Sequence, residues 1–180
     1  MIGELFGRDR GIRLMALALG TLVLAVNILG SEGEPTTTNA DGRPRGELSF
    51  GAGPVVGLGY RTGIIVNARG GGPINEYFGL EASLASLVSP AAVGLFQGNL
   101  VANLTEATWR EGKLMPFLTA GVGIGFPYPF FAINYGGGGK YYFNKRAGLR
   151  VDIRDNMVVA FNERGIRHTL EVSAGLTFRF

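Results

Sequence analysis

Hydrophobic and polar residues alternate one by one along the last thirteen residues of the chain, HTLEVSAGLTFRF. One set of alternate positions is apolar, and the other set is polar or glycine. Because successive side chains of a β-strand point to opposite faces, this pattern predicts an amphipathic strand. A strand of ten or more residues is long for a soluble protein, but its length suits a tilted crossing of a bilayer.

The same alternation recurs upstream. It is found in the segments AGLRVDIR, FAINYGGGGKYYF, MPFLTAGVGIGF, YFGLEASLA and IIVNAR, where Ile65 interrupts the polar face of the last. Two less regular stretches, at about 47–60 and 94–104, have a weaker form of the pattern. Together these segments predict eight strands, and an even number is typical of single-chain outer-membrane barrels.

The polar face of these strands combines glycines with charged residues: Arg69, Glu81, Lys140, Arg150, Asp152, Arg154, Glu171 and Arg179. Glycine on the inner wall of a narrow barrel makes room for long side chains from other strands. The apolar face has aromatic residues near strand ends, as in the girdles at membrane interfaces. We therefore predict an all-β fold, an eight-stranded antiparallel up-and-down transmembrane β-barrel. The alternative is a soluble lipocalin-like secreted barrel, which would turn its apolar face inward.

The eight inward charges are expected to form an ionic cluster with a structural role. Arg150, Asp152 and Arg154 are spaced two apart and share one strand face, and Glu171 and Arg179 lie on the neighbouring strand. Charges of both signs in a lumen that holds only side chains should pair, because burying one charge alone is costly.

The N-terminus has the layout of a secretory signal peptide. Arg8, Arg10 and Arg13 precede the apolar run LMALALGTLVLAVNILG, and a polar segment follows it. The predicted organisation is a signal peptide over 1–30, with cleavage as late as 40 still open, a flexible leader over 31–45 and the barrel over 46–180. An uncleaved anchor is the alternative, although Asn27 interrupts the run.

The connections between strands support an up-and-down order. Pro73–Asn75 and Asn144–Ala147 are short turns, and the segment TEATWREGK is longer. The connections at the other end are expected to be short, except for a longer one over Met157–Arg167.

Composition removes most other classes of function. The chain has no cysteine, which excludes disulfides, thiolate catalysis and cysteine-ligated metals. A net charge of +3 without a dense basic run gives no reason to expect nucleic acid as a partner. The single histidine, His168, lacks the nearby serine of lipid A deacylases and is interpreted as a rim residue. We expect no catalytic residues, no cofactor and no metal site.

Several segments resemble one family. KLMPFLTAGVGIGF, FFAINYGGGGKYYFNKRAGLRVDIRD and EVSAGLTFRF are similar to the last four strands of the outer membrane protein β-barrel domain family, the small outer-membrane-protein-A-like barrels. EYFGLEASL resembles that family's third strand, so the resemblance covers about residues 46–180. The C-terminal aromatics Phe178 and Phe180 are similar to the signal that the barrel-assembly machinery reads.

The resemblance implies the outer membrane of a diderm bacterium, with outer-membrane lipid and lipopolysaccharide as surroundings, but it implies no single activity. We expect an integral outer-membrane barrel with a plugged lumen and a non-enzymatic structural, binding or adhesion role. A narrow channel and a lipid-modifying enzyme remain alternatives.

Overall fold

The computed structural model describes residues 46–57, 62–75, 77–89, 93–104, 114–127, 129–144, 146–160 and 165–180. The predicted signal peptide over 1–30 and leader over 31–45 lie outside these residues. The strands are β1 (Glu47–Gly57), β2 (Gly63–Pro73), β3 (Phe78–Ser89), β4 (Val93–Asn103), β5 (Leu114–Phe126), β6 (Phe130–Tyr142), β7 (Ala147–Ala160) and β8 (Ile166–Arg179).

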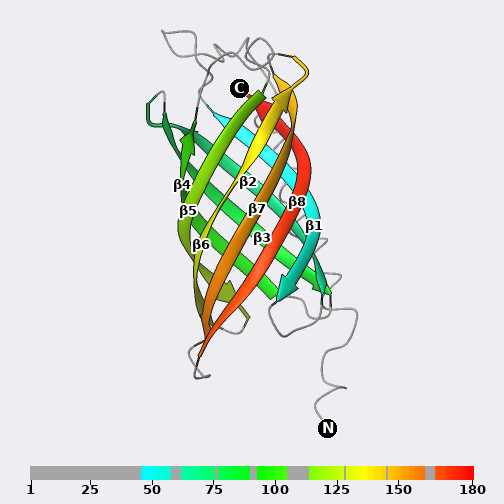
Figure 1. The fold of residues 1–180 in the computed structure, drawn as a ribbon, viewed down its shortest axis with the longest axis vertical. Coiled ribbons are helices and arrows are strands. Elements are labelled where there is room, and N and C mark those ends of the chain that lie inside the picture. Colours follow the sequence, from blue (N-terminus) through cyan, green and yellow to red (C-terminus); the bar gives the residue numbers. More distant parts are fainter. Residues whose placement is uncertain are drawn as a thin grey trace. The chain divides into compact units, whose positions relative to one another are not determined.

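The eight strands form one closed antiparallel barrel in which each strand pairs with its neighbours in sequence (Figure 1). β1 pairs with both β2 and β8, so the ring has no free edge. Gly46 and Phe180 exchange two backbone hydrogen bonds of 2.9 and 3.1 Å where the ring closes. The predicted fold class is therefore confirmed. Within the described ranges, there is no helix long and apolar enough to span a bilayer.

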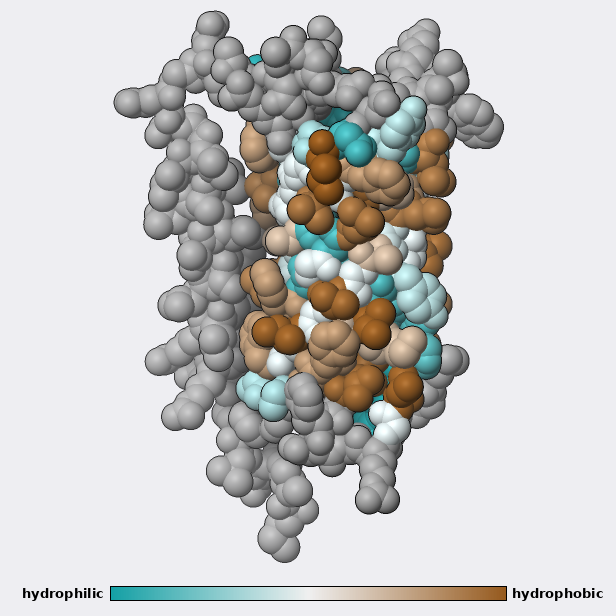
Figure 2. All heavy atoms as spheres, turned by 90° about the vertical axis from the view of Figure 1, so that its left-hand side faces the viewer, coloured by the Kyte–Doolittle hydropathy of each residue, from teal (hydrophilic) through white to brown (hydrophobic). Residues whose placement is uncertain are grey.

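The two faces of the wall have opposite chemistry. On β7, Leu149, Val151 and Ile153 point outward and are about half exposed, at 45%, 47% and 52%. The alternating Asp152 and Arg154 point inward, each with 1% of its surface exposed. Figure 2 shows hydrophobic residues spread over one outer side of the barrel. The polar face of the alternating pattern is thus the inner one, the reverse of a soluble barrel.

Two turns at the end of the barrel where β8 finishes, called here the C-terminal end, have the same construction. The Asn75 side-chain oxygen accepts hydrogen bonds from the backbone N–H groups of Tyr77 and Phe78, at 2.9 and 2.8 Å. Asn144 does the same for Arg146 and Ala147 at 2.8 and 2.7 Å. An asparagine that caps its own turn permits a tight connection, and both turns lie where the sequence predicted them.

At the opposite end, the long connection predicted over 157–167 is wrong in its bounds. β7 continues to Ala160 and β8 already begins at Ile166, so much of that stretch is strand. Gly165, just before β8, has a φ of 129°, a conformation that a residue with a Cβ rarely adopts. Of the two irregular segments, the first forms β1 over Glu47–Gly57, with its last residues, 58–60, outside the described ranges, and the second forms β4.

Inward glycines bring the backbone of one strand close to the side chains of another. A Cβ on Gly138 of β6 would lie 2.9 Å from the ring of Phe117. A Cβ on Gly123 of β5 would lie 2.7 Å from Cγ of Gln97. These glycines leave space for large inward side chains of the neighbouring strands, as narrow barrels require.

Candidate functional site: a charged barrel lumen

The centre of the lumen holds charged side chains from four strands. β7 supplies Arg150, Asp152 and Arg154 because residues spaced by two share a strand face. β2, β3 and β8 supply the other three members, and all six side chains are at least 93% buried. The six residues, named here the ionic cluster, are Arg69, Glu81, Arg150, Asp152, Arg154 and Glu171.

Asp152 is the central acceptor of this cluster. Its Oδ2 atom accepts hydrogen bonds from Arg69 Nη1 and Arg150 Nε, both at 2.9 Å. Its Oδ1 atom lies 3.1 Å from Nη2 of Arg150 and from Nη2 of Arg154. One carboxylate thus contacts all three guanidinium groups, which would otherwise repel one another at close range.

Two glutamates complete the charge balance. Glu81 accepts hydrogen bonds from Arg150 and, at 2.9 Å, from Arg154. Glu171 accepts from Arg69 at 2.9 Å. Three carboxylates therefore face three guanidinium groups across the lumen, and each charge has at least one partner of opposite sign.

Lys140 lies nearer the C-terminal end and pairs with a residue that the sequence did not single out. Its ammonium is 2.7 Å from the Glu47 carboxylate, which is also 3.6 Å from Arg150. Tyr142 donates a hydrogen bond of 2.7 Å to the same carboxylate. Glu47 opens the glycine-rich first strand, where the alternation is weak, so the pattern gave little reason to place it inside.

Arg179 faces inward but stands apart from the ionic cluster. Its guanidinium lies 3.5 Å from the centre of the Tyr142 ring, a cation–π contact, and 3.5 Å from Sδ of Met115. It forms no ion pair with any residue that the structure describes. Phe117 is a further inward residue that sequence reasoning missed; its ring centre is 4.7 Å from the Arg150 guanidinium.

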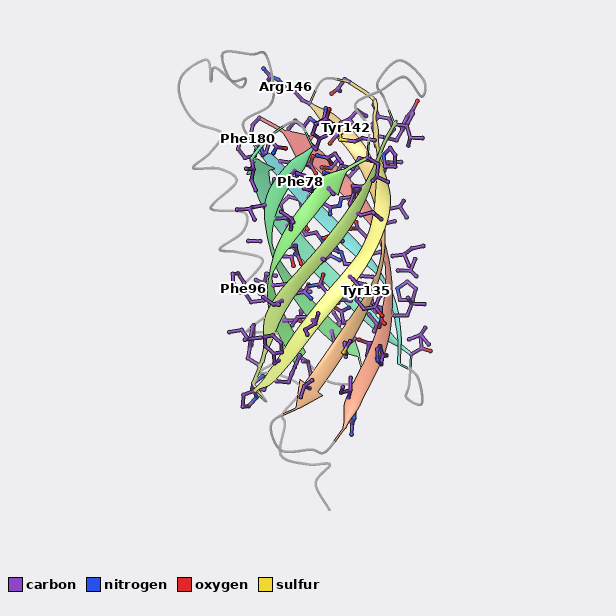
Figure 3. All side chains as sticks on the ribbon, turned by 60° about the vertical axis from the view of Figure 1, so that its left-hand side comes forward. Phe78, Phe96, Tyr135, Tyr142, Arg146 and Phe180 are labelled. Atoms are coloured by element: carbon purple, nitrogen blue, oxygen red, sulfur yellow. The ribbon has the colours of Figure 1, made fainter. Side chains whose placement is uncertain are left out.

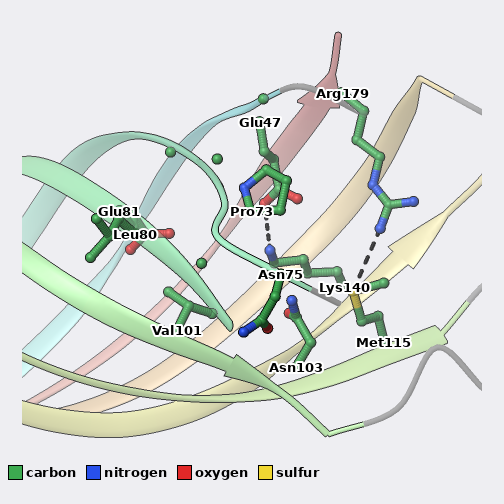
Figure 4. A pocket seen from close by; sticks show the side chains of 14 residues that line it. Glu47, Pro73, Asn75, Leu80, Glu81, Val101, Asn103, Met115, Lys140 and Arg179 are labelled. Carbon is green, nitrogen blue, oxygen red and sulfur yellow. Dashed lines mark hydrogen bonds and ion pairs between the residues drawn. The ribbon is translucent and has the colours of Figure 1, made fainter. Parts of the chain in front are cut away.

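A shallow pocket opens at the C-terminal end of the lumen, with a volume of about 130 Å³ (Figure 4). Glu47, Lys140 and Arg179 line it, together with Asn75 and Asn103 from β2–β3 and β4. Dashed lines in Figure 4 mark the Lys140–Glu47 and Arg179–Met115 contacts. Glu81 is also among the lining residues, so the pocket reaches the ionic cluster.

Beyond the ionic cluster, neutral polar residues cross the lumen. Asn134 donates to Asn99 at 2.9 Å, and Gln97 donates to Asn156 at 2.8 Å. Ser83 connects these two pairs, since it donates to Gln97 at 3.1 Å and accepts from Asn99 at 3.4 Å. These hydrogen bonds join four strands without any net charge.

The end of the lumen opposite the C-terminal end is apolar. Ile65, Ala85, Leu95 and Ala132 are buried together, and Val55, Phe130 and Val158 pack against them. These seven residues are named here the apolar layer. Ile65 is therefore not a break in its strand: it faces inward like Asn67, in a part of the lumen that is not polar.

The two C-terminal aromatics lie on the outer wall. Phe178 pairs with Leu48 of β1 and with Ala147 of β7, and it is 39% exposed. Phe180 is 43% exposed and closes the ring through its backbone bonds to Gly46. Figure 3 places Phe180 near the C-terminal end, close in height to Tyr142.

His168 also lies on the outer wall. Its Nδ1 atom is 2.8 Å from Oδ2 of Asp155, and the Tyr135 hydroxyl donates a hydrogen bond of 2.7 Å to the same oxygen. Thr169, the next residue, donates a hydrogen bond of 3.2 Å to the backbone oxygen of Asn156. Asp155 and Tyr135 were not singled out from the sequence.

Comparison with solved structures finds the same fold. Neisserial surface protein A superimposes with a TM-score of 0.61 at 12% identity, over 75% of this chain and 96% of that one. The N-terminal β-barrel domain of Pseudomonas aeruginosa OprF gives 0.55 at 14% identity, over 76% and 98%. A de novo designed transmembrane β-barrel gives 0.51 at 13% identity, over 77% and 98%. No protein-family model and no curated protein sequence matches the chain.

The chain is therefore an outer-membrane-type β-barrel of the small eight-stranded class. The resemblance to outer-membrane-protein-A-like barrels is confirmed at the level of the fold. A designed barrel matches almost as well as a natural one, so the likeness says nothing about activity. The soluble lipocalin-like alternative is wrong, because the polar face lines the lumen and the exposed face is apolar.

Proposed function

We propose that this chain is a non-enzymatic integral outer-membrane protein whose lumen is closed to solutes, and that it acts as a structural or binding scaffold. The ionic cluster is the observation that carries the proposal. Arg69 of β2 and Glu81 of β3 reach Asp152 and Arg154 of β7 across the lumen, with contacts of 2.9 Å. These side chains occupy the cross-section of the lumen that a channel would need to fill with water. The interior of an eight-stranded barrel is only wide enough for side chains, so little room remains beside them.

The role proposed for the cluster is structural. Each buried charge has a partner of opposite sign, which is what burial in a low-dielectric lumen demands. Among the described residues, no three His, Asp or Glu side chains are grouped to hold a metal ion. The apolar layer supports closure at the other end of the lumen, because it offers no polar groups to a passing ion.

Conductance across a planar lipid bilayer tests closure. The purified chain, folded as judged by a heat-modifiable band on a gel and reconstituted into the bilayer from lipid vesicles that contain it, should give no reproducible single-channel steps of porin size. A large porin in the same bilayers serves as the positive control for insertion and recording. Porin-sized steps from the folded wild-type barrel would replace the closed scaffold with the channel alternative.

We also propose that the N-terminal segment over 1–30 directs export and that the barrel-assembly machinery reads Phe178 and Phe180. Both aromatics lie at the end of the last strand, beside the seam that closes the ring. Lipopolysaccharide and other outer-membrane lipids are the proposed surroundings of the apolar wall.

Deletion of Phe180 should reduce the folded barrel in the outer-membrane fraction and increase the periplasmic amount. The deletion removes a terminal aromatic and two closing hydrogen bonds, so a matched Phe180→Leu variant, which keeps the backbone, separates these effects. Wild-type assembly of both variants, measured by membrane fractionation, would show that the aromatic is not a signal.

A further inference from the structure

Three polar side chains interrupt the apolar outer wall at one place. On β7, the outward row Leu149, Val151 and Ile153 is followed by Asp155. His168 of β8 and Tyr135 of β6 flank this carboxylate from the two neighbouring strands. Ionisable groups on a lipid-facing surface are costly, and where they occur they commonly mark a functional site.

The contacts within this group leave part of the carboxylate available. Tyr135 and His168 both contact Oδ2 of Asp155, at 2.7 and 2.8 Å. Neither of these two side chains binds Oδ1. The Asp155 side chain is only 22% exposed and that of His168 37%, so the unused acceptor lies in a partly sheltered position. A carboxylate oxygen in such a position can accept a further hydrogen bond from a ligand.

A shallow apolar hollow on the outer wall, called here the groove, begins at the same tyrosine. Its lining comes from β4, β5 and β6: Leu100, Ala102, Leu118, Thr119, Ala120, Tyr135 and Gly136. Ala120 pairs with Leu100 on one side and with Tyr135 on the other, so a small side chain lies between two larger ones. The Tyr135 ring thus borders the groove while its hydroxyl binds Asp155. Figure 3 shows Tyr135 on the wall at about the height of Phe96, away from the C-terminal end.

We propose that this face binds one lipid molecule, with an acyl chain in the groove and a hydrogen-bond-donating head group at Asp155. The occupant follows from the chemistry of the two parts. The groove is lined almost wholly by apolar side chains and opens on the wall that faces hydrocarbon. The Asp155 carboxylate lies on β7, on the other side of Tyr135 from Ala120 and the groove. It accepts hydrogen bonds, so it selects a head group with ammonium or hydroxyl donors over one without any.

Native mass spectrometry with two lipids of identical acyl chains tests the site. Phosphatidylethanolamine has N–H donors, whereas phosphatidylcholine has none. The full chain, purified from membranes in detergent and checked by heat-modifiability, should retain phosphatidylethanolamine about tenfold better, the effect of one charge-assisted hydrogen bond. Equal retention of the two lipids by the wild type would overturn the proposal.

Substitutions separate the two parts of the site. Asp155→Asn removes the charge and should abolish most of the preference, because an ammonium donor gains less from an amide oxygen than from a carboxylate. Ala120→Leu fills the groove and should lower retention of both lipids. Ala52→Leu, also on the outer wall but on β1, is the matched control and should change neither.

Two results would contradict this assignment. Equal effects of Ala120→Leu and Ala52→Leu would show that the groove holds no particular lipid. A dimer mass in the wild type that Ala120→Leu abolishes would assign the face to a second copy of the chain instead. Tyr135→Phe gives an independent check, because it keeps the ring beside the groove and removes only the hydroxyl contact with Asp155; its loss of preference should be smaller than that of Asp155→Asn.

Discussion

Along the inner face of β7, Asp152 lies among three guanidinium groups, whereas Val158, three inward positions further on, belongs to the apolar layer. Both regions fill the same narrow lumen, but different forces hold their side chains together. The ionic cluster depends on directional contacts in which each partner neutralises another. The apolar layer depends only on volume, since dispersion and the hydrophobic effect have little directionality.

This difference affects how each region responds to change. Loss of one member of the ionic cluster leaves the remaining charges buried and unbalanced. Loss of a methyl group from the apolar layer leaves a small cavity. The first effect should therefore be larger per substitution, and variants in the two regions can test this.

The largest effect is expected for Asp152→Asn. Neutralising the central carboxylate leaves three arginines facing two glutamates, and breaking a buried ion pair costs about 3–5 kcal/mol. The free energy of unfolding can be followed by urea titration of the heat-modifiable folded band. Asp155→Asn, the same chemical change on the outer side of the same strand, is the matched control and should cost under about 1 kcal/mol. Similar losses of unfolding free energy in both variants would mean that neutralising a carboxylate in the ionic cluster costs no more than neutralising one on the outer wall.

A smaller effect is expected for Leu95→Ala in the apolar layer. Leu95 is 9% exposed, and the hydrogen-bonded wall around it cannot collapse onto the space that the substitution leaves. The loss should be about 2–3 kcal/mol by the same urea titration. Leu100→Ala, on the outer side of the same strand, should cost less because lipid or detergent can fill the gap. A larger loss at Leu95 than at Asp152 would reverse the comparison.

The smallest effect is expected for Ser173→Ala at the margin of the ionic cluster. The Ser173 hydroxyl donates to Glu171 at 3.2 Å and accepts from Arg69 at 3.3 Å, but it carries no charge. Its removal leaves the charge balance intact and should cost about 1 kcal/mol. A loss as large as that of Asp152→Asn would show that hydrogen bonding, rather than charge, dominates the cluster.

The strands and the polarity of their two faces could be predicted from the sequence because both follow from a local rule. Residues two apart share a face, so Arg150, Asp152 and Arg154 had to lie on one side of β7 whatever the rest of the chain did. The asparagine turns were readable for the same reason, since Asn75 and Asn144 bind backbone groups only two and three residues away.

Contacts across the lumen could not be predicted from such a local rule. Arg69 meets Asp152 over a separation of 83 residues, and which side chains meet depends on the tilt and stagger of the closed barrel. For the same reason, nothing in the pattern indicated that Arg179 would stack on Tyr142 rather than join the ionic cluster. Nor did it indicate that Glu47 would pair with Lys140. The group of Asp155, Tyr135 and His168 was equally hidden. The sequence by itself determined the strands and the character of each face, because alternation is a property of the single strand. Only the tertiary structure decided the partners, because closure of the ring sets the height at which each side chain enters the lumen or reaches its neighbour on the outer wall.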